Sequence, residues 1–279
     1  MGLLNRFARQ WVAGETVGDA FRGAREANRR GMGAILNLLG EHYHDRGLVA
    51  GTVREYAEMI RGMREAGIRG CVSIKASQLG IDIDPAWCLE NVVGIVDLVR
   101  EDGGVLWLDM EGSAYTDRTL DLYERLLSRY GRVGVCLQAN LRRTAADLER
   151  LLAVGARIRL CKGAYREPGA IAYLSRPEVD RNYLKLEEVL FSQGNHFAVA
   201  SHDGPMIDRA LDLQKTRPKE FEFQMLMGVR DPLKSKLVGG GHRVLEYIPY
   251  GPNWLPYFLR RLRERPRNVV TMARSFVSG

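Results

Sequence analysis

Short apolar runs alternate with segments of helical spacing through residues 105–161, VLWLDMEGSAYTDRTLDLYERLLSRYGRVGVCLQANLRRTAADLERLLAVGARIRLC. The runs VLWLDM, VGVCLQA and RIRLC carry apolar residues on both faces, which is typical of parallel strands covered by helices. Between them, apolar residues recur every three or four positions in Asp117–Tyr130 and Thr144–Val154, which predicts two amphipathic helices. The stretch therefore predicts an α/β fold with a parallel sheet.

The same alternation extends to both sides of this stretch. The predicted strands are Gly33–Leu39, Cys71–Ala76, Val105–Met110, Val133–Ala139, Arg157–Cys161, His196–Ala200, Phe221–Met227 and His242–Ile248. The predicted helices are Thr52–Ala66, Ala86–Arg100, Asp117–Tyr130, Thr144–Val154, Asp180–Gln193, Pro205–Lys215, Asp231–Val238 and Pro256–Glu264. Strands and helices in strict alternation predict a (β/α)8 TIM-like barrel. A doubly wound open sheet is the main alternative, but no GxGxxG motif opens the first strand–helix turn.

No linker and no shift in composition interrupts the chain, so we expect a single domain over residues 1–279. The barrel is expected over residues 32–265. Residues 1–31 carry Trp11, Val12, Val17 and Phe21, which predicts N-terminal helices packed outside the barrel.

The composition is that of a soluble protein, with 46% hydrophobic and 27% charged residues. No run approaches the roughly 20 apolar residues of a membrane span, and the N-terminus lacks the apolar core of a signal peptide. The net charge of +7 is compatible with nucleic acid, an anionic membrane surface or an anionic ligand. No zinc-finger or RNA-binding motif accompanies it, so nucleic acid is not the expected partner.

The four cysteines are Cys71, Cys88, Cys136 and Cys161. Their spacing contains no CxxC pair, so we expect no metal site. Three of them lie in apolar runs, which favours buried apolar side chains over reactive thiols. This pattern suggests a reducing compartment, and we expect a cytoplasmic protein.

Polar residues stand in or just after every predicted strand, toward its C-terminal end. In chain order they are Glu41, Lys75, Asp109, Glu111, Gln138, Arg159, Lys162, Ser201, His202, Asp203, Glu222, Gln224 and Tyr247. Any one of them has a structural explanation, such as an ion pair between Lys75 and Asp109 or a satisfied core histidine at His202. Because C-terminal strand ends form the active-site mouth of a barrel, the whole set predicts a functional site there.

The cations in this set suggest an anionic ligand such as a phosphate, a carboxylate or a reduced flavin. They include Lys75, Lys162 and Arg159, joined by the adjacent pair Arg260 and Arg261. Consecutive helical residues point about 100° apart. Arg260 and Arg261 therefore reach one carboxylate only if the last helix runs over the barrel mouth.

Read in order, the strand-end segments resemble the proline dehydrogenase family over about Met32 to Glu264. The segments that carry the resemblance are Leu39–Glu41, VSIKASQLG (72–80), LDMEGSAYTD (108–117), RLCKGAYRE (159–167), ASHD (200–203), FEFQMLMG (221–228) and YIPYGPNWLPYFLRRLRE (247–264). The resemblance implies a distorted barrel that binds FAD, with the last helix over the mouth. Ser201 departs from the family pattern, since a threonine is expected there.

The resemblance implies roles for most of the strand-end residues. Lys75, Arg260 and Arg261 are expected to bind the substrate carboxylate, and Arg159 to donate a hydrogen bond near flavin N5. The residues expected to line the substrate pocket are Asp109, Tyr165, Leu226, Tyr247 and Tyr257. Those expected to contact the flavin are Gln138, Lys162, Gly163, Ala164, Ser201, His202, Glu222 and Gln224. Glu41 is expected to pair with Arg260 as a gate.

The resemblance implies oxidation of L-proline to 1-pyrroline-5-carboxylate, with electrons passing to a quinone. The basic ends of the chain suggest peripheral contact with the inner face of a membrane. Three alternatives stay open: a dehydrogenase for hydroxyproline or another cyclic amine, a Schiff-base lyase using Lys162 or Lys75, and a nucleic-acid-binding module without enzymatic activity.

Overall fold

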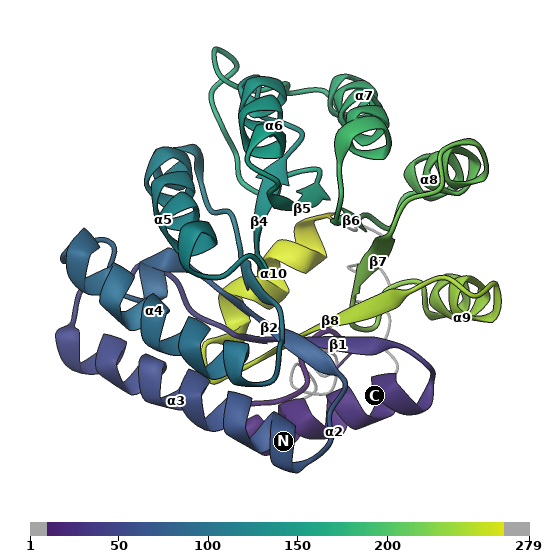
Figure 1. The fold of residues 1–279 in the computed structure, drawn as a ribbon. Coiled ribbons are helices and arrows are strands. Elements are labelled where there is room, and N and C mark those ends of the chain that lie inside the picture. The colour runs from purple at the N-terminus through teal and green to yellow at the C-terminus, as the bar shows by residue number, and fades with distance from the viewer. Residues whose placement is uncertain (1–9, 265–279) are drawn as a thin grey trace, which may run out of the picture.

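Eight parallel strands close into a barrel in the computed structural model, which describes residues 10–264 except for the side chains of 260–264 (Figure 1). The strands are β1 (Gly33–Leu38), β2 (Gly70–Ile74), β3 (Leu106–Leu108), β4 (Val133–Gln138), β5 (Arg157–Cys161), β6 (Phe197–Ala200), β7 (Phe221–Leu226) and β8 (Val244–Tyr250). The α-helices are α2 (Val17–Arg29), α3 (Arg46–Glu65), α4 (Pro85–Glu101), α5 (Thr116–Arg129), α6 (Thr144–Ala153), α7 (Arg176–Gln193), α8 (Gly204–Thr216), α9 (Asp231–Gly239) and α10 (Trp254–Glu264). The pairing of β1 with β8 closes the ring, so the predicted (β/α)8 barrel is confirmed.

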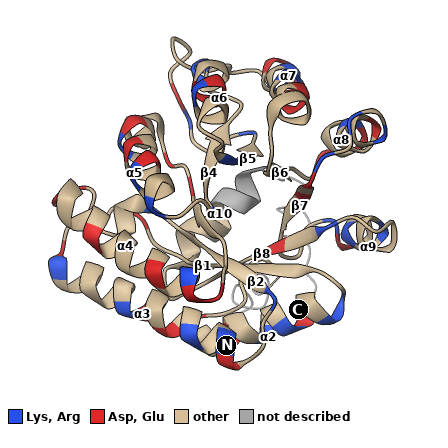
Figure 2. Ribbon diagram, viewed as in Figure 1, with Lys and Arg blue, Asp and Glu red and all other residues tan. Residues whose placement is uncertain are grey.

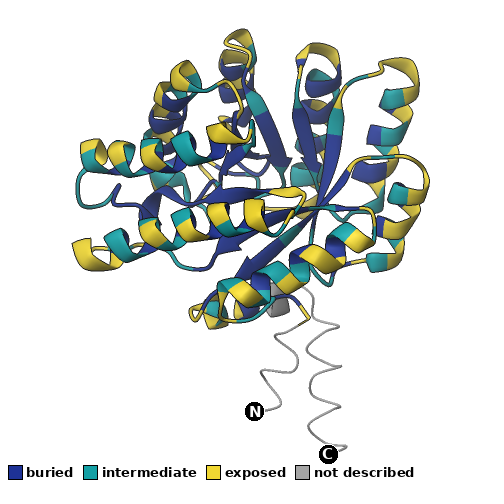
Figure 3. Ribbon diagram, turned by 60° about the horizontal axis from the view of Figure 1, so that its bottom comes forward, coloured by how far each residue is buried: buried dark blue, intermediate teal, exposed yellow. Residues whose placement is uncertain are grey.

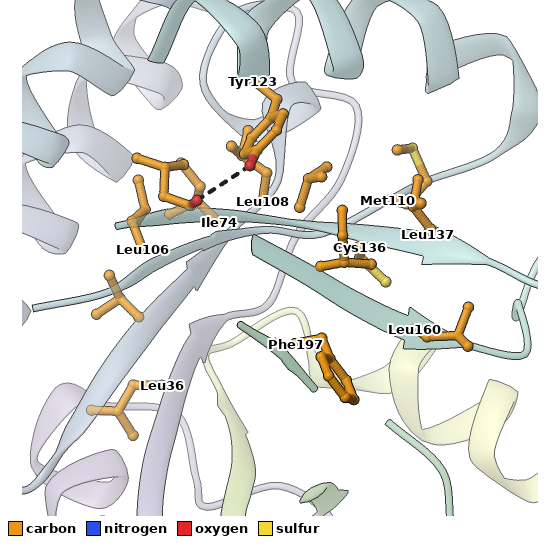
Figure 4. Packing of buried hydrophobic residues seen from close by; sticks show 14 of the residues in the cluster. Leu36, Ile74, Leu106, Leu108, Met110, Tyr123, Cys136, Leu137, Leu160 and Phe197 are labelled. Atoms are coloured by element: carbon orange, nitrogen blue, oxygen red, sulfur yellow. Dashed lines mark hydrogen bonds between the residues drawn. The ribbon is translucent and has the colours of Figure 1, made fainter. Parts of the chain in front are cut away.

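The two faces of each strand differ in polarity. Successive side chains of a strand point to opposite faces, so alternate residues line the barrel interior. Leu36, Val72 and Ile158 belong to the outer layer, which packs against the helices, and Figure 4 shows Leu36 and Tyr123 within the large hydrophobic cluster that includes this layer. The inner layer includes Trp107 and the polar side chains described below. The strands are almost wholly buried (Figure 3), so polar groups inside them need partners.

Several helix and strand boundaries differ from those predicted. Helix α3 begins at Arg46 rather than at Thr52, because the Asp45 side chain caps it by accepting a hydrogen bond from Leu48 N at 2.7 Å. Gly47 and Gly51 interrupt the apolar periodicity there, so the periodicity does not predict the first turns of the helix.

Helix α7 likewise begins before the predicted Asp180. Ser175 and Glu178 form a capping box at its start. Strand β8 runs over Val244–Tyr250, whereas the predicted strand was His242–Ile248.

Residues 10–14 lie along the C-terminal end of β8. Ala13 N donates to Pro249 O, and Gly251 N donates to Gly14 O, both at 2.9 Å. The segment also approaches the turn after β7 so closely that a Cβ at Gly228 would stand 1.8 Å from Gln10 O. Of the N-terminal helices predicted for residues 1–31, the described part contains α2, which packs against β1 and β8.

Charged residues concentrate on the outward faces of the surrounding helices (Figure 2). Within residues 10–264, no helix is long and apolar enough to cross a membrane. The same part of the chain holds no group of three or more His, Cys, Asp or Glu side chains suited to a metal ion.

Candidate active site

A hydrogen-bonded network inside the barrel centres on Asp109, just past the end of β3. Its Oδ1 accepts hydrogen bonds from Ser73 Oγ at 2.7 Å and from Arg159 Nη1 at 2.5 Å. Its Oδ2 accepts one from Tyr247 Oη at 2.6 Å. Arg159 Nη1 also donates to Ser73 Oγ at 3.0 Å. Four strands of the barrel thereby meet at one carboxylate.

Arg159 links this network to β7. Its Nε donates to Gln224 Oε1 at 2.5 Å, and Gln224 Nε2 donates to Glu222 Oε1 at 2.6 Å. Glu222 also forms an ion pair with Arg243, whose Nε lies 3.0 Å from Glu222 Oε2. Glu222 is the second residue of β7, so this pair lies toward the end of the barrel away from the mouth. A direct contact of Glu222 with the flavin stays a prediction.

Burial and charge shape the electrostatics of the network. The guanidinium of Arg159 is 4% exposed and lies over the Trp107 ring at 4.6 Å. Burial alone lowers its pKa, but Asp109 and other neighbours outweigh burial, so the pKa of Arg159 lies above its ordinary value. Burial, and then the charge of Asp109, raise the pKa of Tyr247 well above its ordinary range. Tyr247 therefore stays a neutral hydrogen-bond donor.

A second group of polar side chains stands closer to the mouth. Lys75 Nζ lies 4.0 Å from Glu41 Oε1, and Tyr165 Oη donates to the same oxygen at 3.2 Å. Lys75 is 8% exposed. The structure therefore brings together Lys75 and Tyr165, two of the residues predicted to surround a substrate.

Lys162, which follows β5, is held between two carboxylates. Its Nζ forms ion pairs with Asp180 and with Asp203. Gly163 has φ +102°, and a Cβ there would stand 2.0 Å from Asn140 Oδ1. Only glycine therefore fits this turn, and the next residue, Ala164, is exposed.

The remaining predicted flavin contacts lie at the end of β4 and directly after β6. Gln138 ends β4 and donates from Nε2 to Glu111 O at 2.9 Å. Ser201 Oγ accepts a hydrogen bond from Asp203 N at 3.2 Å. His202 Nε2 accepts one from the backbone N–H of Leu226 at 2.8 Å, which ties the end of β6 to the end of β7.

Helix α10 lies over the mouth. In Figure 1 it crosses the ring of strands. Its residues Tyr257 and Phe258 are buried in a cluster with Leu39 after β1 and Val229 after β7. Trp11 belongs to the same cluster and packs on Phe258, with ring centroids 5.6 Å apart. The side chains of Arg260 and Arg261 lie outside the described residues, so the predicted pairing of Glu41 with Arg260 stays a prediction.

The sequence of the barrel, with all eight strands, also matches a known protein family. Residues 20–274 match the sequence model of the family described as "Proline dehydrogenase". The chain belongs to the proline dehydrogenase family.

Curated proline dehydrogenases resemble the chain along nearly its whole length. It is 35% identical to "Proline dehydrogenase" of Deinococcus radiodurans, over 98% of this chain and 90% of that protein. It is 33% identical to "Proline dehydrogenase 2" of Bacillus subtilis, over 96% of this chain and 93% of that protein.

Solved structures share the fold of this proline dehydrogenase family member. Proline utilization A from Bdellovibrio bacteriovorus, inactivated by N-propargylglycine, superposes with a TM-score of 0.86 at 23% identity. The match covers 93% of this chain and 32% of that one, so the chain spans about a third of the larger protein.

Two members of the proline dehydrogenase site escaped prediction from the sequence. Ser73 lies in an apolar strand and, from the sequence, resembles a small packing residue. Its hydroxyl nevertheless forms hydrogen bonds with both Asp109 and Arg159. Trp107 looks like a core residue, yet its ring lies against the Arg159 guanidinium. A usable signal was present for Ser73, because it stands two positions before Lys75 and therefore shares its face of the strand.

The site of this proline dehydrogenase family member also suits a flavin. Arg159 Nη2 is buried and has no hydrogen-bond partner among the described residues. A buried N–H donor needs an acceptor. The ring nitrogens and carbonyl oxygens of a flavin are acceptors of this kind, so the residues fit the cofactor.

Proposed function

We propose that this chain oxidises L-proline to 1-pyrroline-5-carboxylate with FAD as its cofactor. The observation that carries the proposal is the buried Arg159, fixed by Asp109, Ser73 and Gln224 and left with one unpaired nitrogen. The family and the names of the curated relatives support proline as the substrate. The family also favours oxidation over a Schiff-base lyase.

The substrate carboxylate is assigned to Lys75 together with Arg260 and Arg261. Lys75 is nearly buried, and its nearest described carboxylate is Glu41 at 4.0 Å, a separation that leaves its ammonium able to bind a second anion. Charge-assisted hydrogen bonds from lysine and arginine to a carboxylate are strong and orient the bound molecule. Tyr165 belongs to the pocket wall beside Lys75.

Asp109 is assigned a positioning role. Its two oxygens already accept three hydrogen bonds, from Ser73, Arg159 and Tyr247. A carboxylate engaged in this way holds its donors in place and is poorly suited to remove a proton. The proton of the substrate nitrogen is therefore assigned to water.

The bound flavin would supply the chemistry of accepting a hydride from the ring carbon next to nitrogen. Arg159 would donate a hydrogen bond to it and stabilise negative charge on its reduced ring. Leu226, Tyr247 and Tyr257 would wall the pocket and exclude water, which strengthens the polar contacts. The further flavin contacts are assigned to Gln138, Lys162, Gly163, Ala164, Ser201, His202, Glu222 and Gln224.

The proposal also includes an electron acceptor and a membrane surface as partners of the enzyme. Electrons would leave the reduced flavin for a quinone. The net charge of +7 favours contact of a cytoplasmic enzyme with an anionic membrane face. Co-sedimentation with anionic vesicles, compared with neutral ones, tests this contact, and equal recovery with both would argue against it.

An absorption spectrum of the purified protein, repeated after adding L-proline without air, tests the main proposal. We expect flavin bands that bleach on addition of proline. Persistent bands would retain the flavin but shift the substrate to another cyclic amine. A colourless protein that takes up no added FAD would overturn the proposal.

Replacing Tyr247 by serine is expected to improve the use of hydroxyproline relative to proline. The Tyr247 side chain is fixed by Asp109 at 2.6 Å, so its bulk crowds any hydroxyl on the ring. Removing it should change the ratio of kcat/KM values for the two substrates about tenfold toward hydroxyproline. Steady-state kinetics with both substrates measure the ratio, and an unchanged ratio would remove Tyr247 from substrate discrimination.

Replacing Trp11 by alanine is expected to loosen α10 and raise KM for proline. Trp11 is 4% exposed and packs on Phe258, so its loss leaves a cavity behind the helix that carries Tyr257. We expect KM to rise about tenfold, because small displacements of positioned groups weaken binding steeply. The substitution should also lower the melting temperature.

Trp87→Ala is the matched control for this prediction. Trp87 packs under Arg46 on the outside of the barrel, with the guanidinium 4.6 Å from the ring. It should lower the melting temperature while KM stays near that of the parent. A KM that rises equally in both variants would show a general loss of stability instead of a role for Trp11.

A further inference from the structure

Two cysteines meet on the inner face of the barrel wall. Cys136 Sγ donates a hydrogen bond to Cys161 Sγ at 3.3 Å, across the pair β4–β5. Cys136 stands opposite Arg159 in the register, and Cys161 stands opposite Gln138. Since register partners share a face, both thiols point to the same side as Arg159. They therefore belong to the wall of the proposed site.

The two thiols are chemically unequal. Cys136 is buried, whereas Cys161 at the mouth end of β5 is partly exposed. The hydrogen bond from Cys136 and a second one from the Gly163 backbone outweigh burial and lower the pKa of Cys161 below its ordinary value. The hydrogen bond to Cys161, followed by burial, raises the pKa of Cys136. Cys161 is therefore the better nucleophile of the pair, and Cys136 is the thiol that retains its proton.

The other cysteines lack these features. Burial raises the pKa of both Cys71 and Cys88 to about 12. Cys88 is buried and donates to Ala76 O at 3.7 Å. These two thiols are inert controls carried by the same chain.

We propose that Cys136 and Cys161 form a peroxide-reactive dithiol in the wall of the active site. The Cys161 thiol loses its proton, and the thiolate attacks one oxygen of hydrogen peroxide, forms a sulfenic acid and releases hydroxide, which takes up that proton to become water. The Cys136 sulfur then attacks the sulfenyl sulfur, forms the disulfide and releases a second hydroxide, which takes up the Cys136 proton to become water. In total, two thiols are oxidised, one peroxide is reduced, and two molecules of water form.

A disulfide between Cys136 and Cys161 would change the site by moving the backbone of the strands that carry them. Bond formation brings the sulfurs from 3.3 Å to about 2.05 Å. Because the two cysteines are offset by two residues in the register, bond formation requires the backbone around Cys136 or Cys161 to shift. Arg159 lies two residues before Cys161, and Lys162 follows it directly. Oxidation is therefore expected to displace Arg159 and lower turnover.

The test treats the reduced holoenzyme with hydrogen peroxide and maps its cysteine peptides by mass spectrometry. We expect a disulfide between Cys136 and Cys161, with Cys71 and Cys88 still alkylated as free thiols. In Cys136→Ser, dimedone should trap a sulfenic acid at Cys161. These readouts are independent of the proposed proline oxidation.

A second measurement, the turnover of proline after peroxide treatment, rests on the proposed function. Peroxide should reduce turnover about tenfold or more, and dithiothreitol should restore it. Cys161→Ser and Cys136→Ser, each compared with its own untreated sample, should escape the reversible loss.

Two outcomes would overturn the proposal: both thiols still reduced after treatment, or oxidation spread equally over all four cysteines. A disulfide without any effect on turnover, or equal inactivation of Cys161→Ser and the parent, would retain the dithiol and reject its coupling to Arg159.

Discussion

Replacing Arg159 by methionine should lower kcat/KM for proline about 10²–10³-fold, the size expected for losing a positioned donor in a buried site. Methionine keeps much of the side-chain volume but removes every hydrogen bond to Asp109, Ser73 and Gln224. The Asp109 carboxylate then loses its cation inside the barrel. The flavin content of the purified variant should also fall, because the donor proposed to meet the cofactor is gone.

Arg157→Met is the matched control for this substitution. Arg157 stands on the same face of β5, two residues earlier and at the opposite end of the barrel. It should retain the flavin and most of its kcat/KM. Arg159→Lys adds a second test, since lysine keeps the charge but loses the forked geometry of the guanidinium. Normal kinetics in Arg159→Met would remove Arg159 from the proposed mechanism.

Replacing Glu187 by glutamine should stabilise the fold at alkaline pH. Glu187 lies on α7 and is fully buried, and neither of its carboxylate oxygens has a hydrogen-bond partner among the described residues. Burial raises its pKa to about 8, against a small opposing effect of Arg209. A buried charge of this kind is costly, so the folded chain keeps Glu187 protonated at neutral pH.

The sign of the pH dependence follows from proton binding. Below an ordinary glutamate pKa of 4.5, the folded and unfolded chains are both protonated, and Glu187 adds no dependence. Between 4.5 and about 8, only the unfolded chain releases the proton, so the free energy of unfolding falls as pH rises. Above about 8 both states are ionised and the fall ends.

The variant should therefore gain stability that grows with pH and levels off. At about pH 9 we expect about 3 kcal/mol, less than the full shift at about 1.4 kcal/mol per pKa unit, because the folded chain relaxes around the charge. Urea unfolding at several pH values measures this difference. Glu188→Gln is the control, since Glu188 is a half-buried neighbour paired with Arg209 near the surface and should change stability little. A parallel pH profile for the parent and Glu187→Gln would refute the prediction.

The barrel could be predicted because its two periodicities are local. An apolar run between two amphipathic helices identifies a parallel strand without knowledge of its neighbours. Boundaries were harder where a cap rather than an apolar residue starts a helix, as Asp45 and Ser175 do. Those caps act through hydrogen bonds of polar side chains, which apolar periodicity does not reveal.

The site could be predicted only as a set of strand-end residues. Which of them touch depends on the stagger of the strands, and this stagger brings Asp109, Arg159 and Tyr247 together inside the barrel. The sequence analysis placed Glu222 among the residues of the barrel mouth. In the structure, its ion pair with Arg243 lies toward the end of the barrel away from the mouth. Side-chain pairing across a closed barrel is a property of the register and not of any one segment.

The contact of Trp11 with Phe258 has a consequence for how the protein is made. The ribosome delivers Trp11 nearly 250 residues before Phe258, and the β1–β8 pairing that closes the ring likewise joins strands far apart in the chain. A nascent chain that still lacks β8 and α10 therefore has neither a closed barrel nor a covered mouth. Catalytic competence therefore has to wait until β8 and α10 have both left the ribosome and packed.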